Sequence, residues 1–127
     1  MTYLLDTSTF LWAATDPAKL SRRARSLCES QRETLVVSAA SLWEIIIKCG
    51  FGGLRIANPA RTLSDWTARL SARILPIEAA HTYAVYGLPA IHRDPFDRLL
   101  VAQAIAEDVP LLTSDERMRQ YPARCIW

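Results

Sequence analysis

Acidic residues end or border several of the apolar segments in this chain. They are Asp6, Glu44, Asp97 and Asp115. If the fold gathers them, two carboxylates about 4 Å apart repel by roughly 4 kcal/mol at an effective dielectric of about 20. A hard divalent cation such as Mg2+ relieves that repulsion and takes carboxylate, water and phosphate oxygens as ligands. Because such ions assist displacement at phosphodiesters, and no arrangement of His, Cys or Ser competes, the pattern favours nuclease chemistry.

Strand-like and helical segments alternate along the chain and must position these acids. Apolar runs predict strands at 3–5, 35–38, 74–77, 111–113 and 124–127. Helical spacing predicts helices at 9–14, 20–31, 39–49, 59–73, 78–87, 94–108 and 116–121. This alternation predicts a three-layer α/β/α fold with a central, mainly parallel sheet. Ligands bind beyond the carboxyl ends of such strands, where we expect Asp6 and Asp115.

Asp6 and Glu44 each have a structural alternative to a catalytic role. Asp6 could cap the helix that follows it, although the hydroxyl residues at 7–9 could also do so. Glu44 could form a surface pair with Lys48 one turn later, worth only about 0.3 kcal/mol. Because that helix is rich in apolar residues, we expect it to be mostly buried and its charged residues to border a cleft or pair within one.

The segment Asp94–Asp97 begins a helix, and its two acids differ. Asp94 fits the capping position, with Pro95 directly after it. Asp97 also suits the helix dipole, but it leads into an apolar helix that we expect to be buried, so it is the stronger functional candidate. Further on, either Ser114 or Asp115 could cap the next helix.

Length and composition predict one globular domain, residues 1–127. A chain of this size can bury a real core, and no apolar run approaches the ~20 residues of a membrane span. The N-terminus has no signal-peptide pattern. The three cysteines lie far apart without a CxxC pair, which argues against disulfides or a zinc site. We therefore expect a cytoplasmic protein without a membrane association.

Basic residues and histidines offer weaker signals. The net charge of +2 does not by itself indicate a nucleic-acid partner, but all basic residues except Lys19 and Lys48 are arginines, which suit phosphate contacts. Arg93 and Arg98, beside the Asp94–Asp97 segment, are predicted to bind substrate; codon bias is the alternative explanation of the arginine content. His92 has no metal-ligand partner at a standard spacing, so we interpret it as structural or superficial, although it and Arg93 could meet a phosphate.

Taken in order, these segments resemble the PIN-domain ribonucleases, in particular the VapC-type toxins of bacterial toxin–antitoxin pairs. The resemblance covers essentially the whole chain, and only the ordered set of short motifs makes it specific. The matching segments are Leu4–Thr7, Ser38–Ile45 with Lys48, His92–Leu100 with Ala102–Ala104, and Leu112–Asp115.

The resemblance implies a metal-dependent endoribonuclease that hydrolyses RNA with water as the nucleophile. Asp6, Glu44, Asp97 and Asp115 would be catalytic, and Asp6, Asp97 and Asp115 would hold Mg2+ or Mn2+. The supporting polar residues would be Thr7, Thr113 and Asp94. The implied partners are an RNA substrate, a small cognate antitoxin and a second copy of the chain in a homodimer.

Other functions remain open at this point. A receiver-like signalling domain shares the α/β architecture but needs a late lysine, and none follows Lys48. A haloacid-dehalogenase-type phosphatase needs a second acid two residues after Asp6, where this chain has Ser8. A PIN-type RNA-processing protein that is not a toxin would share every feature named above.

Overall fold

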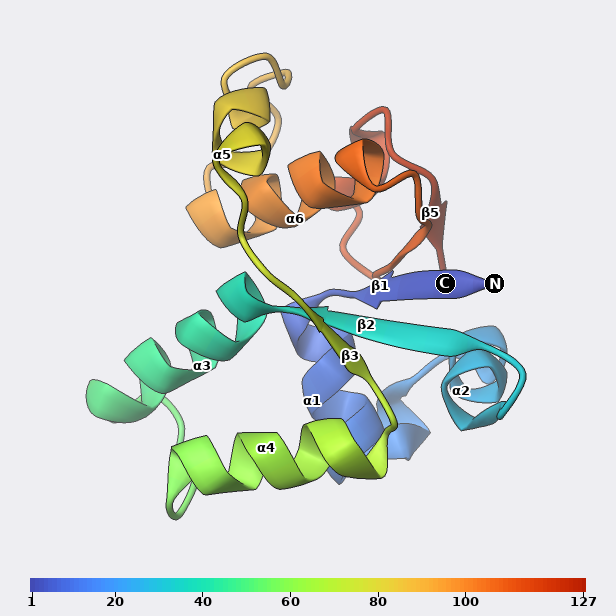
Figure 1. Ribbon diagram of the computed structural model, residues 1–127, viewed down its shortest axis with the longest axis vertical. Helices are drawn as coiled ribbons and strands as arrows, with labels where there is room; N and C mark the ends of the chain where they lie inside the picture. Colours follow the sequence, from blue (N-terminus) through green and yellow to red (C-terminus); the bar gives the residue numbers. More distant parts are fainter.

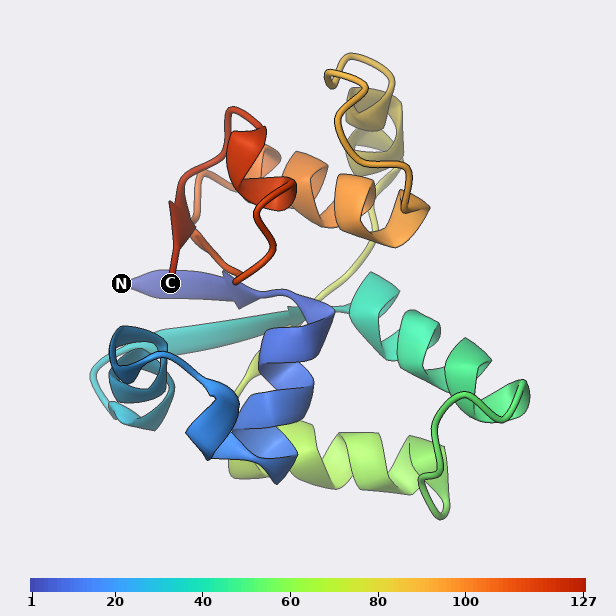
Figure 2. The ribbon, with the colours of Figure 1, turned by 180° about the vertical axis from the view of Figure 1, so that it is seen from behind.

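The computed structural model describes residues 1–127, which build one sheet with helices on both of its faces (Figures 1 and 2). The strands are β1 (Thr2–Leu5), β2 (Thr34–Ser38), β3 (Arg73–Leu75), β4 (Leu111–Leu112) and β5 (Cys125–Ile126). Their order in the sheet is β3-β2-β1-β4-β5, and every neighbouring pair is parallel. The predicted three-layer α/β/α fold with a parallel sheet is confirmed.

Helices connect the strands and cover the sheet in two groups. The α-helices are α1 (Thr7–Thr15), α2 (Arg22–Glu29), α3 (Ala39–Gly50), α4 (Pro59–Arg69), α5 (Ala79–Val85) and α6 (Pro95–Ala106). Two short 3-10 helices are η1 (Pro17–Lys19) and η2 (Met118–Gln120). Figure 1 shows α1 to α4 on one side of the sheet and α5 and α6 on the other. No helix is long and apolar enough to cross a lipid bilayer.

Successive strand residues point to opposite faces, and this alternation divides the core in two. Leu4 of β1 packs in the cluster that includes Leu100 of α6, whereas its neighbour Leu5 packs in the cluster that includes Phe10 of α1 and Ile45 of α3. The strands read as continuous apolar runs because both faces of the parallel sheet are covered.

The two central strands bring the first and last predicted acids to one edge. Leu5 of β1 pairs with Leu112 of β4, and the Asp6 N–H donates to the Leu112 carbonyl over 3.1 Å. The next residues along, Asp6 and Thr113, therefore emerge side by side beyond the carboxyl ends. This register places the predicted site where open parallel sheets bind ligands.

Three predicted boundaries were wrong in detail. The helix expected to reach residue 73 ends at Arg69, because Ser71 adopts a left-handed backbone with φ of 51°. Arg73 instead begins β3 and pairs with Val36. The helix expected at 116–121 is only the 3-10 turn η2, and the strand expected at 124–127 is reduced to β5. β3, which overlaps the strand predicted at 74–77, lies at one edge of the sheet.

Candidate active site

A polar cavity of about 330 Å³ opens at the carboxyl edge of the sheet. Its lining residues are Asp6, Thr7, Ser8, Leu11, Glu44, Lys48, Asp94, Asp97, Ser114 and Asp115. All four acids singled out in the sequence line it, although they come from the end of β1, from α3, from α6 and from the segment after β4. The fold thus brings together carboxylates that lie up to 109 residues apart in the sequence.

Asp6 both caps α1 and lines the cavity. Its Oδ1 accepts a hydrogen bond of 2.8 Å from the Thr9 N–H, and its Oδ2 accepts one of 2.6 Å from the Thr113 hydroxyl. The carboxylate is 5% exposed, and this burial raises its pKa, although the bonds from Thr113 and Thr9 oppose the rise. The structural role considered in the sequence and the predicted site position therefore belong to the same side chain.

Glu44 of α3 also lines the cavity and is held by two partners. Its Oε1 accepts a 2.7 Å hydrogen bond from the Thr7 hydroxyl, which also lies 3.0 Å from the Ser41 hydroxyl. Its Oε2 pairs with the Lys48 ammonium at 2.7 Å, and the hydrogen bond to Glu44 raises the pKa of Lys48. Glu44 is buried whereas Lys48 is half-exposed, so the expected Glu44–Lys48 pair exists and stands at the cavity rather than on a solvated helix face.

Asp94 and Asp97 have the different roles expected of them. Asp94 caps α6, and its Oδ1 accepts from the N–H groups of Phe96 at 2.8 Å and Asp97 at 3.3 Å. Asp97 lines the cavity, where burial, together with the charges of Asp94 and Glu44, raises its pKa to about 7. The negative charge of Asp97 is therefore poorly compensated by the protein.

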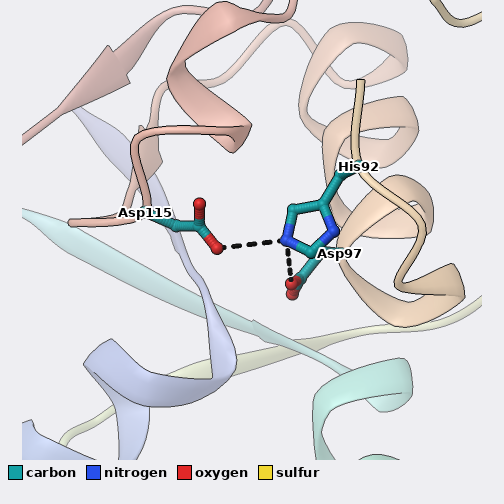
Figure 3. Close-up of side chains that lie close together, drawn as sticks. All are labelled: His92, Asp97 and Asp115. Carbon is teal, nitrogen blue, oxygen red and sulfur yellow. Dashed lines mark hydrogen bonds and ion pairs between the residues drawn. The ribbon is translucent and has the colours of Figure 1, made fainter. Parts of the chain in front are cut away.

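Asp115 and Asp97 converge on one imidazole (Figure 3). The Nε2 atom of His92 lies 3.1 Å from Asp97 Oδ2 and 3.2 Å from Asp115 Oδ2. The other oxygen of Asp115 accepts from the Arg117 N–H at 2.8 Å. Partial burial tends to raise the pKa of Asp115, but the hydrogen bonds from Arg117 and His92 outweigh it, and the net pKa is lowered.

The contacts of His92 were not anticipated from the sequence, which predicts a structural or surface residue because no second metal-ligand residue stands at a standard spacing. Its side chain is 13% exposed and touches two of the predicted metal ligands. The signal available in the sequence was its position directly before the acidic segment Asp94–Asp97, in a loop that must pass the carboxyl edge of the sheet.

The arginines and one lysine are placed differently from the acids. Arg98 donates to the carbonyls of Pro89 at 2.8 Å and Val85 at 3.1 Å, and Arg93 is exposed. Neither arginine lines the cavity, so their predicted contact with substrate has no support in its geometry and stays a prediction. Lys48, not proposed as a site residue from the sequence, is the basic side chain that does line it.

The donor set of the cavity fits a hard divalent cation. Five carboxyl groups line the cavity with a single ammonium group, so acidic groups greatly outnumber basic ones there. Ligand atoms of His92, Asp97 and Asp115 all lie within 4.8 Å of one another, a separation that one ion can span. Oxygen-rich sites of this kind suit Mg2+ or Mn2+ better than softer metals.

A parallel sheet covered on both faces by helices, with a cavity of carboxylates beyond its strand ends, fits metal-assisted phosphodiester hydrolysis. The PIN domain family model matches residues 3–124, and the chain belongs to this family. Membership removes the receiver and phosphatase alternatives, and the resemblance stated from the sequence is confirmed.

Individual relatives support the same assignment. The chain is 29% identical over 123 residues to Ribonuclease VapC22 of Mycobacterium tuberculosis, covering 94% of this chain and 92% of that protein. Its fold is similar to that in the crystal structure of VapBC2 from Rickettsia felis bound to a DNA fragment from their promoter. There the TM-score is 0.72 at 20% identity, over 99% of this chain and 98% of the other. It is also similar to VapC20 of Mycobacterium tuberculosis, a sarcin-ricin loop cleaving toxin, with a TM-score of 0.60 at 19% identity over 93% of each chain.

Proposed function

We propose that this chain is an endoribonuclease that depends on Mg2+ or Mn2+ and acts in the cytoplasm as the toxin of a type II toxin–antitoxin pair. In this proposal residues 1–127 form a single PIN-like domain. The observation that carries the proposal is the convergence of Asp6, Glu44, Asp97 and Asp115 on one cavity. The ribonuclease named among its relatives supports RNA as the substrate.

In this proposal each acid of the cavity has its own task. Asp6, Asp97 and Asp115 would hold the cation, because they line one cavity from three separate segments. When bound, the ion supplies the positive charge that lowers the pKa of a water molecule and neutralises charge developing on the phosphate. Glu44 completes the acidic set and, with Lys48 beside it, presents both a proton acceptor and a cation to the substrate.

Two threonines hold the acids in place. The Thr113 hydroxyl donates to Asp6, and the Thr7 hydroxyl at the start of α1 donates to Glu44 of α3. Both threonines are buried, which limits competition from water for these bonds. This rigidity favours catalysis, because carboxylates that are already oriented need no reorganisation when the charge of the reaction develops.

A small antitoxin and a second copy of the chain are the proposed partners. The relatives with a similar fold include VapBC assemblies, which is what supports the antitoxin. Several large apolar side chains of this chain lie exposed, as interaction surfaces require. They include Trp43 (57% exposed), Phe51 (89%), Tyr83 (76%) and Tyr86 (96%).

The test is cleavage of defined RNAs by the purified protein in Mg2+, in Mn2+ and in EDTA. We expect cleavage with either ion and none with EDTA, and a loss of about 100-fold or more for Asp6→Asn, comparable with removal of a major electrostatic contributor. Asp65→Asn, an exposed acid of α4 outside the cavity, is the control that keeps activity. Equal cleavage under all these conditions would refute the proposal.

The toxin role needs a separate experiment, because an RNA-processing PIN protein would show the same cleavage. Growth after induction of the chain alone is compared with growth when the product of the neighbouring gene is co-expressed. Arrest that the neighbour relieves, and that Asp6→Asn also removes, supports the toxin. Unaffected growth with full cleavage activity in vitro would favour the processing enzyme.

A further inference from the structure

We propose that His92 is a positioning residue whose imidazole N–H holds Asp97 and Asp115 in the arrangement that receives the divalent cation. The inference deepens the proposed function and rests on it for the role of the cation. The geometry that points to it is the placement of one nitrogen, Nε2, within 3.2 Å of carboxylate oxygens from two different segments (Figure 3).

The hydrogen bond at the other ring nitrogen decides where the proton lies. His92 Nδ1 is 3.1 Å from the backbone nitrogen of Asp94, and a peptide N–H can only donate. Nδ1 must therefore be the acceptor, so the neutral ring carries its proton on Nε2. That proton points between Asp97 and Asp115 and is shared by two acceptors.

This tautomer also separates His92 from the ligands of the ion. A histidine coordinates a metal through an unprotonated nitrogen, and here the lone pair of Nδ1 is committed to Asp94 while Nε2 bears hydrogen. His92 is thus suited to orient the carboxylates rather than to bind the ion itself. Carboxylate ligands are commonly oriented by such hydrogen bonds, and loss of the orienting group typically weakens metal affinity or activity about 10- to 100-fold.

Further hydrogen bonds hold the loop that carries His92. The buried Tyr121 hydroxyl accepts from the His92 N–H at 2.8 Å and from the Arg98 guanidinium at 3.1 Å. Arg98 also donates to the carbonyl of Val85, at the end of α5, and to that of Pro89 in the segment that leads to His92. A continuous set of hydrogen bonds therefore runs from Arg98 through Tyr121 to the backbone of His92.

This set of contacts gives Arg98 a task that its sequence position did not suggest. An arginine next to Asp97 looks like a phosphate contact, but its two terminal nitrogens donate to two carbonyls and a phenol. It fixes the segment from which His92 reaches the two acids. Because Asp97 lies on α6 and Asp115 follows β4, one N–H group joins three parts of the chain at the cavity.

Two substitutions distinguish the two ring nitrogens. The amide nitrogen of His92→Gln can take the place of Nε2 and donate to the carboxylates, whereas the amide oxygen of His92→Asn can replace only Nδ1. Mn2+ affinity is measured by isothermal titration of the purified variants and the parent chain. We expect His92→Asn to bind Mn2+ about 10- to 100-fold more weakly and His92→Gln to stay within about threefold of the parent.

A second measurement reads the tautomer without any metal. Long-range proton–nitrogen NMR of the metal-free protein, labelled with 15N-histidine, should show His92 protonated at Nε2 and unprotonated at Nδ1. Pulsed EPR of the Mn2+-loaded protein should show no directly coordinated histidine nitrogen. Tyr121→Phe, which removes the hydroxyl behind the loop, should lower Mn2+ affinity less than His92→Asn does.

Each outcome decides the proposal. Equal losses in the Asn and Gln variants, full Mn2+ affinity in His92→Asn, an Nδ1–H tautomer or a coordinated histidine nitrogen would each overturn it. Absence of Mn2+ binding by the parent chain would overturn it together with the proposed function. Mn2+ binding with the expected Asn–Gln difference, but without RNA cleavage, would reject the ribonuclease and leave the positioning role standing.

Discussion

The carboxylates on the two sides of the cavity have different hydrogen-bond partners. On the α3 side, formed by Asp6, Thr7, Glu44 and Lys48, each acid has donors from the protein: hydroxyl and backbone groups hold Asp6, and a hydroxyl and an ammonium hold Glu44. On the α6 side, formed by His92, Asp97 and Asp115, a single imidazole serves two acids.

This difference gives the two sides of the cavity different tasks: the α3 side fixes the orientation of its carboxylates, and the α6 side supplies negative charge for a cation. On the α3 side several donors hold the carboxylates at fixed positions, although burial raises the pKa of Asp6 there. On the α6 side Asp97, whose pKa is raised to about 7, shares its one imidazole with Asp115, and a cation bound there relieves the cost of its charge. We therefore expect the α6 side to govern metal affinity and the α3 side to govern stability.

The largest expected effect is on catalysis at the α6 side. Asp97→Asn should lower the rate of RNA cleavage in Mn2+ about 100-fold or more, because a charged ligand of the cation is lost. Asp94→Asn is the matched substitution three residues away, and it should cost less than about 10-fold, since Asn caps a helix as well as Asp does. Single-turnover cleavage of one defined RNA measures both. Equal losses would mean that Asp94 is a ligand of equal rank.

The next largest effect is on the stability of the α3 side. Thr113→Val removes the hydroxyl that donates to Asp6 Oδ2 and leaves a buried carboxylate oxygen without that partner. We expect the free energy of unfolding to fall by about 1–3 kcal/mol, measured by urea denaturation. Thr15→Val, at an exposed position of α1, should change it by less than about 0.5 kcal/mol. A stable Thr113→Val protein would contradict the view that this side is fixed by hydrogen bonds.

The third prediction concerns pH in the absence of metal. The pKa of Asp97 is raised from a usual 3.8 to about 7 in the folded protein, so the folded state binds this proton more tightly than the unfolded state. The cost of the charged carboxylate is present in full above pH 7 and is relieved as pH falls through 7 toward 4. After allowance for solvent screening, we expect a gain of about 1–2 kcal/mol in unfolding free energy between pH 8 and pH 5.

Asp97→Asn is the control for this pH dependence. The variant has no carboxyl group at the position, so its stability in EDTA should exceed that of the parent chain at pH 8 and approach it at pH 5. Chemical denaturation at the two pH values compares them. If the unfolding free energy of the parent chain changes with pH in the same way as that of the variant, Asp97 does not cause the pH dependence.

The smallest effect is expected where charge is already compensated. Lys48→Gln removes the ammonium paired with Glu44 but leaves the Thr7 hydrogen bond in place. Because Lys48 is half-exposed, its loss should lower the unfolding free energy by only about 1 kcal/mol. A larger loss of RNA cleavage than of stability would indicate that Lys48 contacts the substrate.

Much of the architecture could be predicted from local sequence. The β-branched and apolar runs predicted the strands, and the alternation with helices predicted the parallel sheet and its ligand-binding edge. Boundaries were less accurate where a backbone conformation, such as that of Ser71, ended an element that its side chains would have allowed to continue. Short elements near the C-terminus depend on tertiary packing, and their extent was overestimated.

The candidate site could also be predicted only in part from the sequence. Asp6, Asp97 and Asp115 could be proposed because each stands next to a strand end or helix start, and the capping role of Asp94 was correctly expected. His92 could not, because its significance depends on two partners, one of them 23 residues away. Arg98 was interpreted from its neighbours in sequence, whereas its contacts come from the preceding loop and Tyr121.

The sequence by itself determined the kind of residues that meet at the sheet edge, because strand periodicity and parallel topology act through local patterns and short connections. Only the tertiary structure decided how those carboxylates are compensated. Hydrogen bonds depend on tenths of an ångström and on groups from distant segments, and the burial that raises the pKa of Asp97 exists only once the layers pack. The acidic residues can therefore be recognised in the sequence. Their division into an α3 side, where several donors hold the carboxylates, and an α6 side, where two carboxylates share one imidazole, arises on folding.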